Sequence, residues 1–113
     1  MHEYSVTKSL VELCDNEAKK NKIKKIRLIK VRIGRFTGFS PEAINFYFDY
    51  LKNGTRCADA KIEFFEIPIR IKCGTCNYED EIDEPIFLCP VCGRDNIEVL
   101  SGREFYVESI EGE

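Results

Sequence analysis

Two pairs of cysteines constrain this chain of 113 residues more than any other feature. Each pair has the spacing Cys-x-x-Cys, Cys73 with Cys76 and Cys89 with Cys92, and twelve residues separate the two pairs. Two tight turns of this kind can bring four sulfurs to about 2.3 Å from one ion, as in a closed tetrahedral zinc site. Because four thiolates leave no position for water, we expect a structural zinc ion and no zinc catalysis.

The sequence leaves two other uses of these cysteines open. A pair of disulfides would need an oxidising compartment, whereas a mononuclear iron centre of rubredoxin type is compatible with the same four sulfurs. We find no secretory signal and no run of roughly 18 apolar residues, so we expect a cytoplasmic protein with reduced thiols and no membrane association. The other two cysteines, Cys14 and Cys57, are expected to be small buried apolar residues.

The hydrophobic pattern predicts two helices. From residue 4 to about residue 21, apolar positions recur at steps of three and four residues, namely Val6, Leu10, Leu13, Cys14 and Ala18. A second helix is predicted to begin at Pro41, because Ser40 can cap it and proline suits the first helical position. Asn53 and Gly54 supply its end.

Three segments have the alternating or β-branched pattern of strands, residues 24–34, 61–71 and 103–110. Pro68 lacks an N–H and indicates an edge or a bulge in the second of them. We therefore expect an α+β fold, with two helices, a roughly three-stranded sheet and an inserted four-cysteine module resembling a zinc ribbon. We assign residues 1–70 and 102–113 to the α+β domain and residues 71–101 to the zinc-binding module, and expect the two strands flanking the insertion to pair.

The charge pattern weakens the case for nucleic-acid binding. The chain carries 17 basic and 20 acidic residues, a formal net charge of -3. A run from Lys19 to Arg35 nevertheless contains nine basic residues and no acid. The alternative function is therefore a zinc-ribbon module for nucleic-acid or protein interaction. The structural explanation of the same basic run is that it forms a solvated helix end and strand face. With one histidine and a closed four-sulfur shell, we do not expect an enzyme.

The only histidine, His2, suggests a second metal site at the amino terminus. The Met1 α-amine, the His2 backbone nitrogen and the His2 imidazole can close adjacent chelate rings around one ion, an arrangement that suits Ni(II) or Cu(II). Glu3 could add an oxygen ligand, accept a hydrogen bond from the imidazole, or simply be the acid that favours a helix start. The alternative is a frayed terminus without a function.

With these residues identified, the chain resembles the HypA/HybF family of hydrogenase nickel-incorporation proteins over essentially its full length. The matching features are Met1-His2-Glu3, Ile33-Gly34 followed by Thr37-Gly38, Pro41-Glu42 with Phe46 and Phe48, Gly54-Thr55, the two Cys-x-x-Cys pairs and the closing Glu108-Ser109-Ile110-Glu111.

This resemblance implies a cytoplasmic nickel metallochaperone that helps deliver Ni(II) to the precursor of a [NiFe]-hydrogenase large subunit, together with a maturation GTPase. His2 matches the family's nickel ligand, and Cys73, Cys76, Cys89 and Cys92 match its zinc ligands. Met1, through its amine, and Glu3 are candidate additional nickel ligands. Because the chain has one histidine, a second imidazole at nickel would come from a partner or from another copy in a homodimer.

Overall fold

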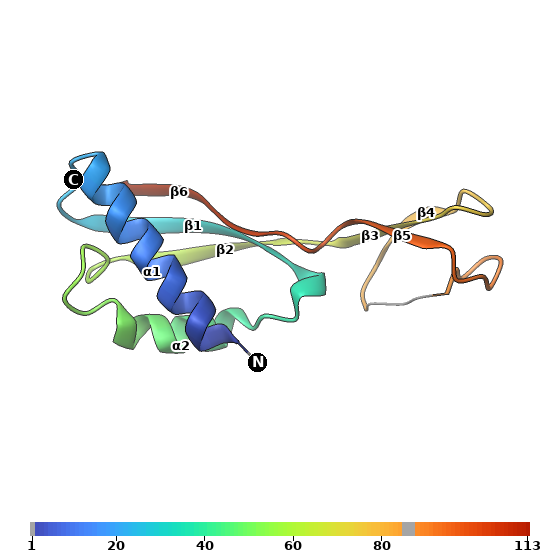
Figure 1. The fold of residues 1–113 in the computed structure, drawn as a ribbon, viewed down its shortest axis with the longest axis horizontal. Helices are drawn as coiled ribbons and strands as arrows, with labels where there is room; N and C mark the ends of the chain where they lie inside the picture. The colour runs from blue at the N-terminus through green and yellow to red at the C-terminus, as the bar shows by residue number, and fades with distance from the viewer. Residues whose placement is uncertain (1, 85–87) are drawn as a thin grey trace. The chain divides into compact units, whose positions relative to one another are not determined.

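The computed structural model describes residues 2–84 and 88–113 and confirms an α+β fold (Figure 1). Its elements in chain order are α1 (Glu3–Lys20), β1 (Ile26–Gly34), the short 3-10 helix η1 (Arg35–Thr37), α2 (Pro41–Leu51), β2 (Lys61–Ile67), β3 (Ile69–Cys73), β4 (Glu79–Ile82), β5 (Ile97–Ser101) and β6 (Phe105–Gly112). They form two sheets of three strands each. Within the described residues, no helix is both long and apolar enough to cross a membrane.

The chain divides into two compact units. The first contains the chain up to Arg32, Phe39–Phe65 and Tyr106–Glu113, and the second contains Ile33–Gly38 and the described part of Glu66–Phe105. Both helices belong to the first unit, whereas the four paired cysteines and the strands β3, β4 and β5 belong to the second.

The sheet of the first unit has the strand order β2-β1-β6. Figure 1 shows β1 and β2 running in the same direction, with α2 returning the chain between them. β6 runs antiparallel to β1, since Lys25 and Glu113 exchange both backbone N–H···O bonds, each 3.0 Å long. Residues from both helices, β1 and the segment before β2 form the core, and each is at most 4% exposed: Leu10, Val11, Cys14, Ala18, Ile26, Ile29, Val31, Ile44, Phe48, Cys57 and Ala60.

The expected pairing of the two strands that flank the insertion is wrong. β1 lies between β2 and β6, and the predicted strand over residues 61–71 is two strands, β2 and β3, that meet at Pro68 and belong to different sheets. The physical reason is that, within the sheet β2-β1-β6, β1 is the strand with fully buried side chains, such as Ile29 and Val31, whereas β2 contains no fully buried residue. A strand buried in this way takes the central position of a sheet.

The first helix is confirmed, but the predicted buried face is only partly right. Leu13 is 48% exposed, while Thr7 and Val11 lie in the core. The hydroxyl of Thr7 donates to the Glu3 carbonyl oxygen at 2.6 Å, so this polar side chain can be buried without an unsatisfied donor.

The second helix begins at Pro41, and the Ser40 hydroxyl accepts from the Ala43 N–H, as predicted.

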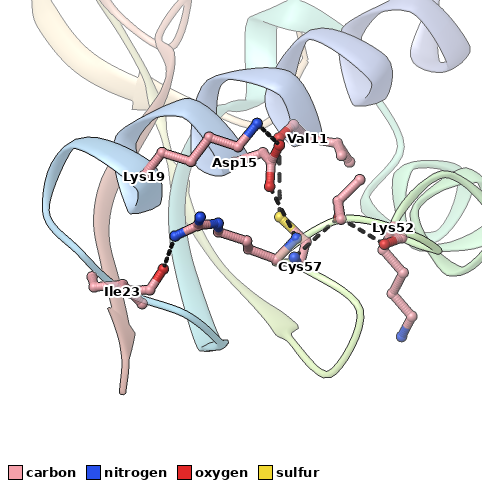
Figure 2. Close-up of polar contacts among 8 residues, drawn as sticks. Val11, Asp15, Lys19, Ile23, Lys52 and Cys57 are labelled. Carbon is pink, nitrogen blue, oxygen red and sulfur yellow. Dashed lines mark hydrogen bonds and ion pairs between the residues drawn. The ribbon is translucent and has the colours of Figure 1, made fainter.

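A polar network joins α1 to the segment that leads into β2 (Figure 2). The Asp15 carboxylate accepts the Arg56 N–H at 2.9 Å and lies 3.1 Å from the Lys19 amine. The Arg56 guanidinium donates to the Ile23 carbonyl, and the Cys57 sulfur lies 4.0 Å from the Val11 carbonyl. The Arg56 N–H, assisted by Lys19, lowers the pKa of Asp15 below its ordinary value.

We predict that Asp15→Asn lowers the free energy of unfolding at pH 7 by about 1 kcal/mol, since a charged acceptor is lost in a partly exposed network. Because the folded pKa is lowered, the ionised carboxylate stabilises the protein above the unfolded pKa, and this contribution is lost as the pH falls through the folded pKa. Urea unfolding should therefore show the difference between variant and parent shrinking below about pH 4.

The matched control is Glu17→Gln, which removes an ion pair on the same helix between two exposed side chains, Glu17 and Lys20. It should change the free energy of unfolding by less than about 0.5 kcal/mol. A loss at Asp15 that is equally large at pH 7 and pH 3 would contradict a contribution from the ionised carboxylate.

Candidate metal centre

The four paired cysteines converge on one point in the second unit. The Sγ atoms of Cys73, Cys76, Cys89 and Cys92 all lie within 4.8 Å of one another. Cys73 and Cys92 are separated by 3.7 Å between sulfurs, and Cys76 and Cys89 by 3.6 Å. Sulfurs placed tetrahedrally at 2.3 Å from an ion would be about 3.8 Å apart. The donor set and its spacing therefore fit a zinc ion.

The same distances argue against the disulfide alternative. All six cysteines of the chain are free, and a disulfide would hold its sulfurs at about 2.05 Å. The separations of 3.6 and 3.7 Å are instead those of sulfurs that share one ion. The structure thus brings all four predicted ligands together as thiols.

Each Cys-x-x-Cys pair forms a tight turn with the same backbone pattern. The residue after the second cysteine has a left-handed conformation, with φ of 65° at Asn77 and 75° at Gly93. The N–H of each of these residues donates at 2.9 Å to the carbonyl of the first cysteine of its pair. Asparagine and glycine adopt positive φ most readily. Their presence after the second cysteine of each pair therefore indicates this turn from the sequence alone.

Backbone N–H groups in these turns also point at the sulfurs. The N–H groups of Cys76 and Thr75 lower the pKa of Cys73 to about 6, and the Thr75 nitrogen lies 3.4 Å from its sulfur. The N–H groups of Cys92 and Val91 similarly lower the pKa of Cys89. Because the thiolate is the form that binds metal, these donors favour metal binding at Cys73 and Cys89. Burial and the neighbouring sulfurs instead raise the pKa of Cys76.

Three short strands hold the two turns. β3 lies between β4 and β5 and is antiparallel to both, with Lys72 opposite Glu79 on one side and Glu98 on the other. The side chains of Ile69 and Ile71 are fully buried. Few other apolar side chains of the described part of this unit are buried, so metal binding, worth about 10 kcal/mol in small zinc modules, is expected to contribute much of its stability.

We predict that removing the metal with a chelator unfolds the second unit selectively. Amide hydrogen exchange should become fast in β3, β4 and β5 and stay slow in α1 and β1, because the first unit has its own apolar core. Restoring zinc should restore the protection. Unchanged exchange in β3 after verified metal removal would show that the cysteine cluster does not depend on its ion.

The basic run from Lys19 to Arg35 is neutralised by acids. Among the described residues, seven of its nine cations lie within 4.0 Å of a carboxylate oxygen, in the pairs Lys19–Asp15, Lys20–Glu17, Lys25–Asp59, Arg27–Glu113, Lys30–Glu111, Arg32–Glu108 and Arg35–Asp83. Exposed ion pairs contribute little to the stability of a fold. The acids nevertheless offset the positive charge of the run and so weaken its attraction for the phosphates of a nucleic acid. This arrangement disfavours the nucleic-acid alternative.

The amino terminus offers different chemistry. His2 is exposed directly before α1, and its carbonyl accepts the Val6 N–H and the Ser5 hydroxyl, each at 3.0 Å. In the part of the chain that the structure describes, the His2 N–H and imidazole contact no hydrogen-bond partner. Met1 lies outside the described residues. Glu3 is buried, and its Oε2 accepts the Ser40 N–H at 3.2 Å.

Comparison with known proteins decides the family. Residues 1–112 match the family described as "Hydrogenase/urease nickel incorporation, metallochaperone, hypA". The chain belongs to the HypA family. The Hydrogenase maturation factor HypA of Moorella thermoacetica is 41% identical over 113 residues, which is 100% of both chains. That of Caldanaerobacter subterraneus subsp. tengcongensis is also 41% identical, over 114 residues and 100% of both chains.

Solved HypA structures have the same fold. The solution structure of the Ni metallochaperone HypA from Helicobacter pylori has a TM-score of 0.70 at 28% identity, covering 99% of this chain and 97% of that one. A second solution structure of a HypA protein has a TM-score of 0.72 at 28% identity, with coverages of 99% and 96%. Membership in the HypA family makes this chain a non-enzymatic metallochaperone of hydrogenase maturation.

Proposed function

We propose that this HypA chain binds Ni(II) at its amino terminus and helps insert it into the [NiFe]-hydrogenase large subunit, while Zn(II) at the four cysteines has a structural role. The observation that supports the nickel site is the hydrogen bonding of His2. Its carbonyl is used to start α1, but its N–H and imidazole are without partners in the described part of the chain. Both nitrogens can therefore bind a metal without breaking a hydrogen bond of the helix.

The chemistry of this terminus suits a cargo ion. The α-amine of Met1, the backbone nitrogen of His2 and the imidazole would supply three nitrogens in a plane, which Ni(II) accepts. The fourth position stays open to an exchangeable ligand, through which the ion can be passed on. Since the metal must displace protons from these nitrogens, its affinity is expected to fall at acidic pH.

Zinc would be held by Cys73, Cys76, Cys89 and Cys92. A shell of four thiolates leaves no coordination position open for water or another ligand. The zinc ion would therefore fix the two tight turns and take no part in nickel delivery. The two ions thus bind to different donor sets, sulfur in the second unit and nitrogen at the amino terminus, which keeps the cargo separate from the structural metal.

The proposed partners follow from the same role. The chain would act with a hydrogenase maturation GTPase and with the precursor of the hydrogenase large subunit, the acceptor of the metal. Because His2 is the only histidine, a homodimer is one way to provide a second imidazole to the same ion.

A titration with Ni(II) tests the proposed site. Zinc-loaded protein with its native amino terminus should be compared with His2→Ala and with protein whose terminus is acetylated, since each change removes one nitrogen donor. We predict that each lowers the nickel affinity by more than about tenfold, while zinc stays bound.

Lys8→Ala, an exposed substitution on α1, is the matched control and should leave the nickel affinity unchanged. Equal affinity in all four proteins would exclude the terminal nitrogens as the nickel site. Zinc loss that accompanies the change at His2 would show that the two metal sites are not separate.

A further inference from the structure

Glu3 carries a buried carboxylate at the first position of α1, and this carboxylate contacts the other helix. Glu3 is 8% exposed, and its Oε2 accepts the N–H of Ser40 at 3.2 Å. Ser40 is the residue that caps α2, and its own hydroxyl accepts the Ala43 N–H at 3.2 Å. Two N–H groups at the start of α2 are therefore satisfied by side chains, one of which comes from α1.

The electrostatics of this contact are favourable. The start of an α-helix carries a partial positive charge, so a carboxylate there stabilises the helix. Glu3 lies in the first turn of α1, and its carboxylate also contacts the cap of α2. One negative charge thereby serves the positive ends of both helices, which explains why an acid is buried at this position.

A ring contact supports the same connection. The Tyr4 ring packs edge-to-face on the Tyr47 ring of α2, with centroids 5.4 Å apart and planes at 89°. The backbone on the α1 side is fixed as well, because the Thr7 hydroxyl holds the Glu3 carbonyl and the Val6 N–H holds that of His2. The first turn of α1 is thus anchored on α2, with His2 directly before it.

We propose that the side chain of Glu3 is a positioning residue for the nickel site, which anchors the amino terminus on the Ser40 N–H and keeps this hydrogen bond when nickel binds. The inference rests on the proposed binding of nickel by Met1 and His2. If the Glu3 carboxylate turned to the metal, the partly buried Ser40 N–H would lose its acceptor. The anchored carboxylate leaves the fourth position of nickel free for a ligand from the acceptor.

The test follows the Ser40 amide proton by hydrogen exchange in zinc-loaded, full-length protein with a native terminus. Adding Ni(II) should change its exchange rate by less than about twofold. Glu3→Ala should accelerate Ser40 exchange in nickel-free protein by about tenfold, because the Ser40 N–H loses its acceptor. It should also weaken nickel binding by about tenfold, because the amino terminus is no longer anchored by this hydrogen bond. Glu3→Gln, which keeps an acceptor oxygen without the charge, should restore both to within about threefold.

Two results would overturn the proposal. Faster Ser40 exchange on nickel addition would show that the carboxylate leaves α2, and Glu3→Gln with the nickel affinity of Glu3→Ala would show that the carboxylate itself is a ligand. Glu12→Ala, which removes an exposed acid of α1, is the matched control. If His2→Ala keeps full nickel affinity, the proposed function fails and with it the nickel role of Glu3, whereas Ser40 exchange without nickel still reports the anchor.

Discussion

The convergence of four cysteine sulfurs is the constraint on which the second unit of this HypA chain depends. β3, β4 and β5 are at most five residues long, and the described part of this unit buries only a few apolar side chains, such as Ile69 and Ile71. Short strands with so little apolar contact do not hold two irregular turns on their own. Backbone N–H groups favour the thiolates of Cys73 and Cys89. An ion bound by the four sulfurs would supply the missing stabilisation.

The amino terminus is organised by the opposite principle. The first unit has an apolar core made by both helices and β1, and the exposed His2, the proposed nickel ligand, lies outside that core. An ion with a closed shell of four sulfurs exchanges poorly, whereas an ion held by an exposed terminus with an open position can leave. In the proposed function, the chain thus separates a metal that maintains structure from one that is delivered, as a metallochaperone requires.

Local patterns allowed much of this structure to be predicted. The Cys-x-x-Cys spacing, the Ser40 cap and the end of α2 near Gly54 depend on neighbouring residues, and the structure has all three. Apart from the buried face of α1, where Leu13 is exposed, the failures concern contacts between distant residues. Neither the position of β1 between β2 and β6 nor the acids that neutralise the basic run follow from a local pattern, since partners such as Arg32 and Glu108 lie 76 residues apart. Glu3 and Ser40, 37 residues apart, belong to the same class.

X-ray absorption at the nickel and zinc edges of protein loaded with both metals tests whether the two metals bind to two different donor sets. We expect a zinc shell of four sulfurs at about 2.3 Å and a nickel shell of nitrogen and oxygen without sulfur. Sulfur in the nickel shell, or fewer than four sulfurs around zinc once nickel is bound, would instead show that the cysteine cluster takes part in carrying the cargo.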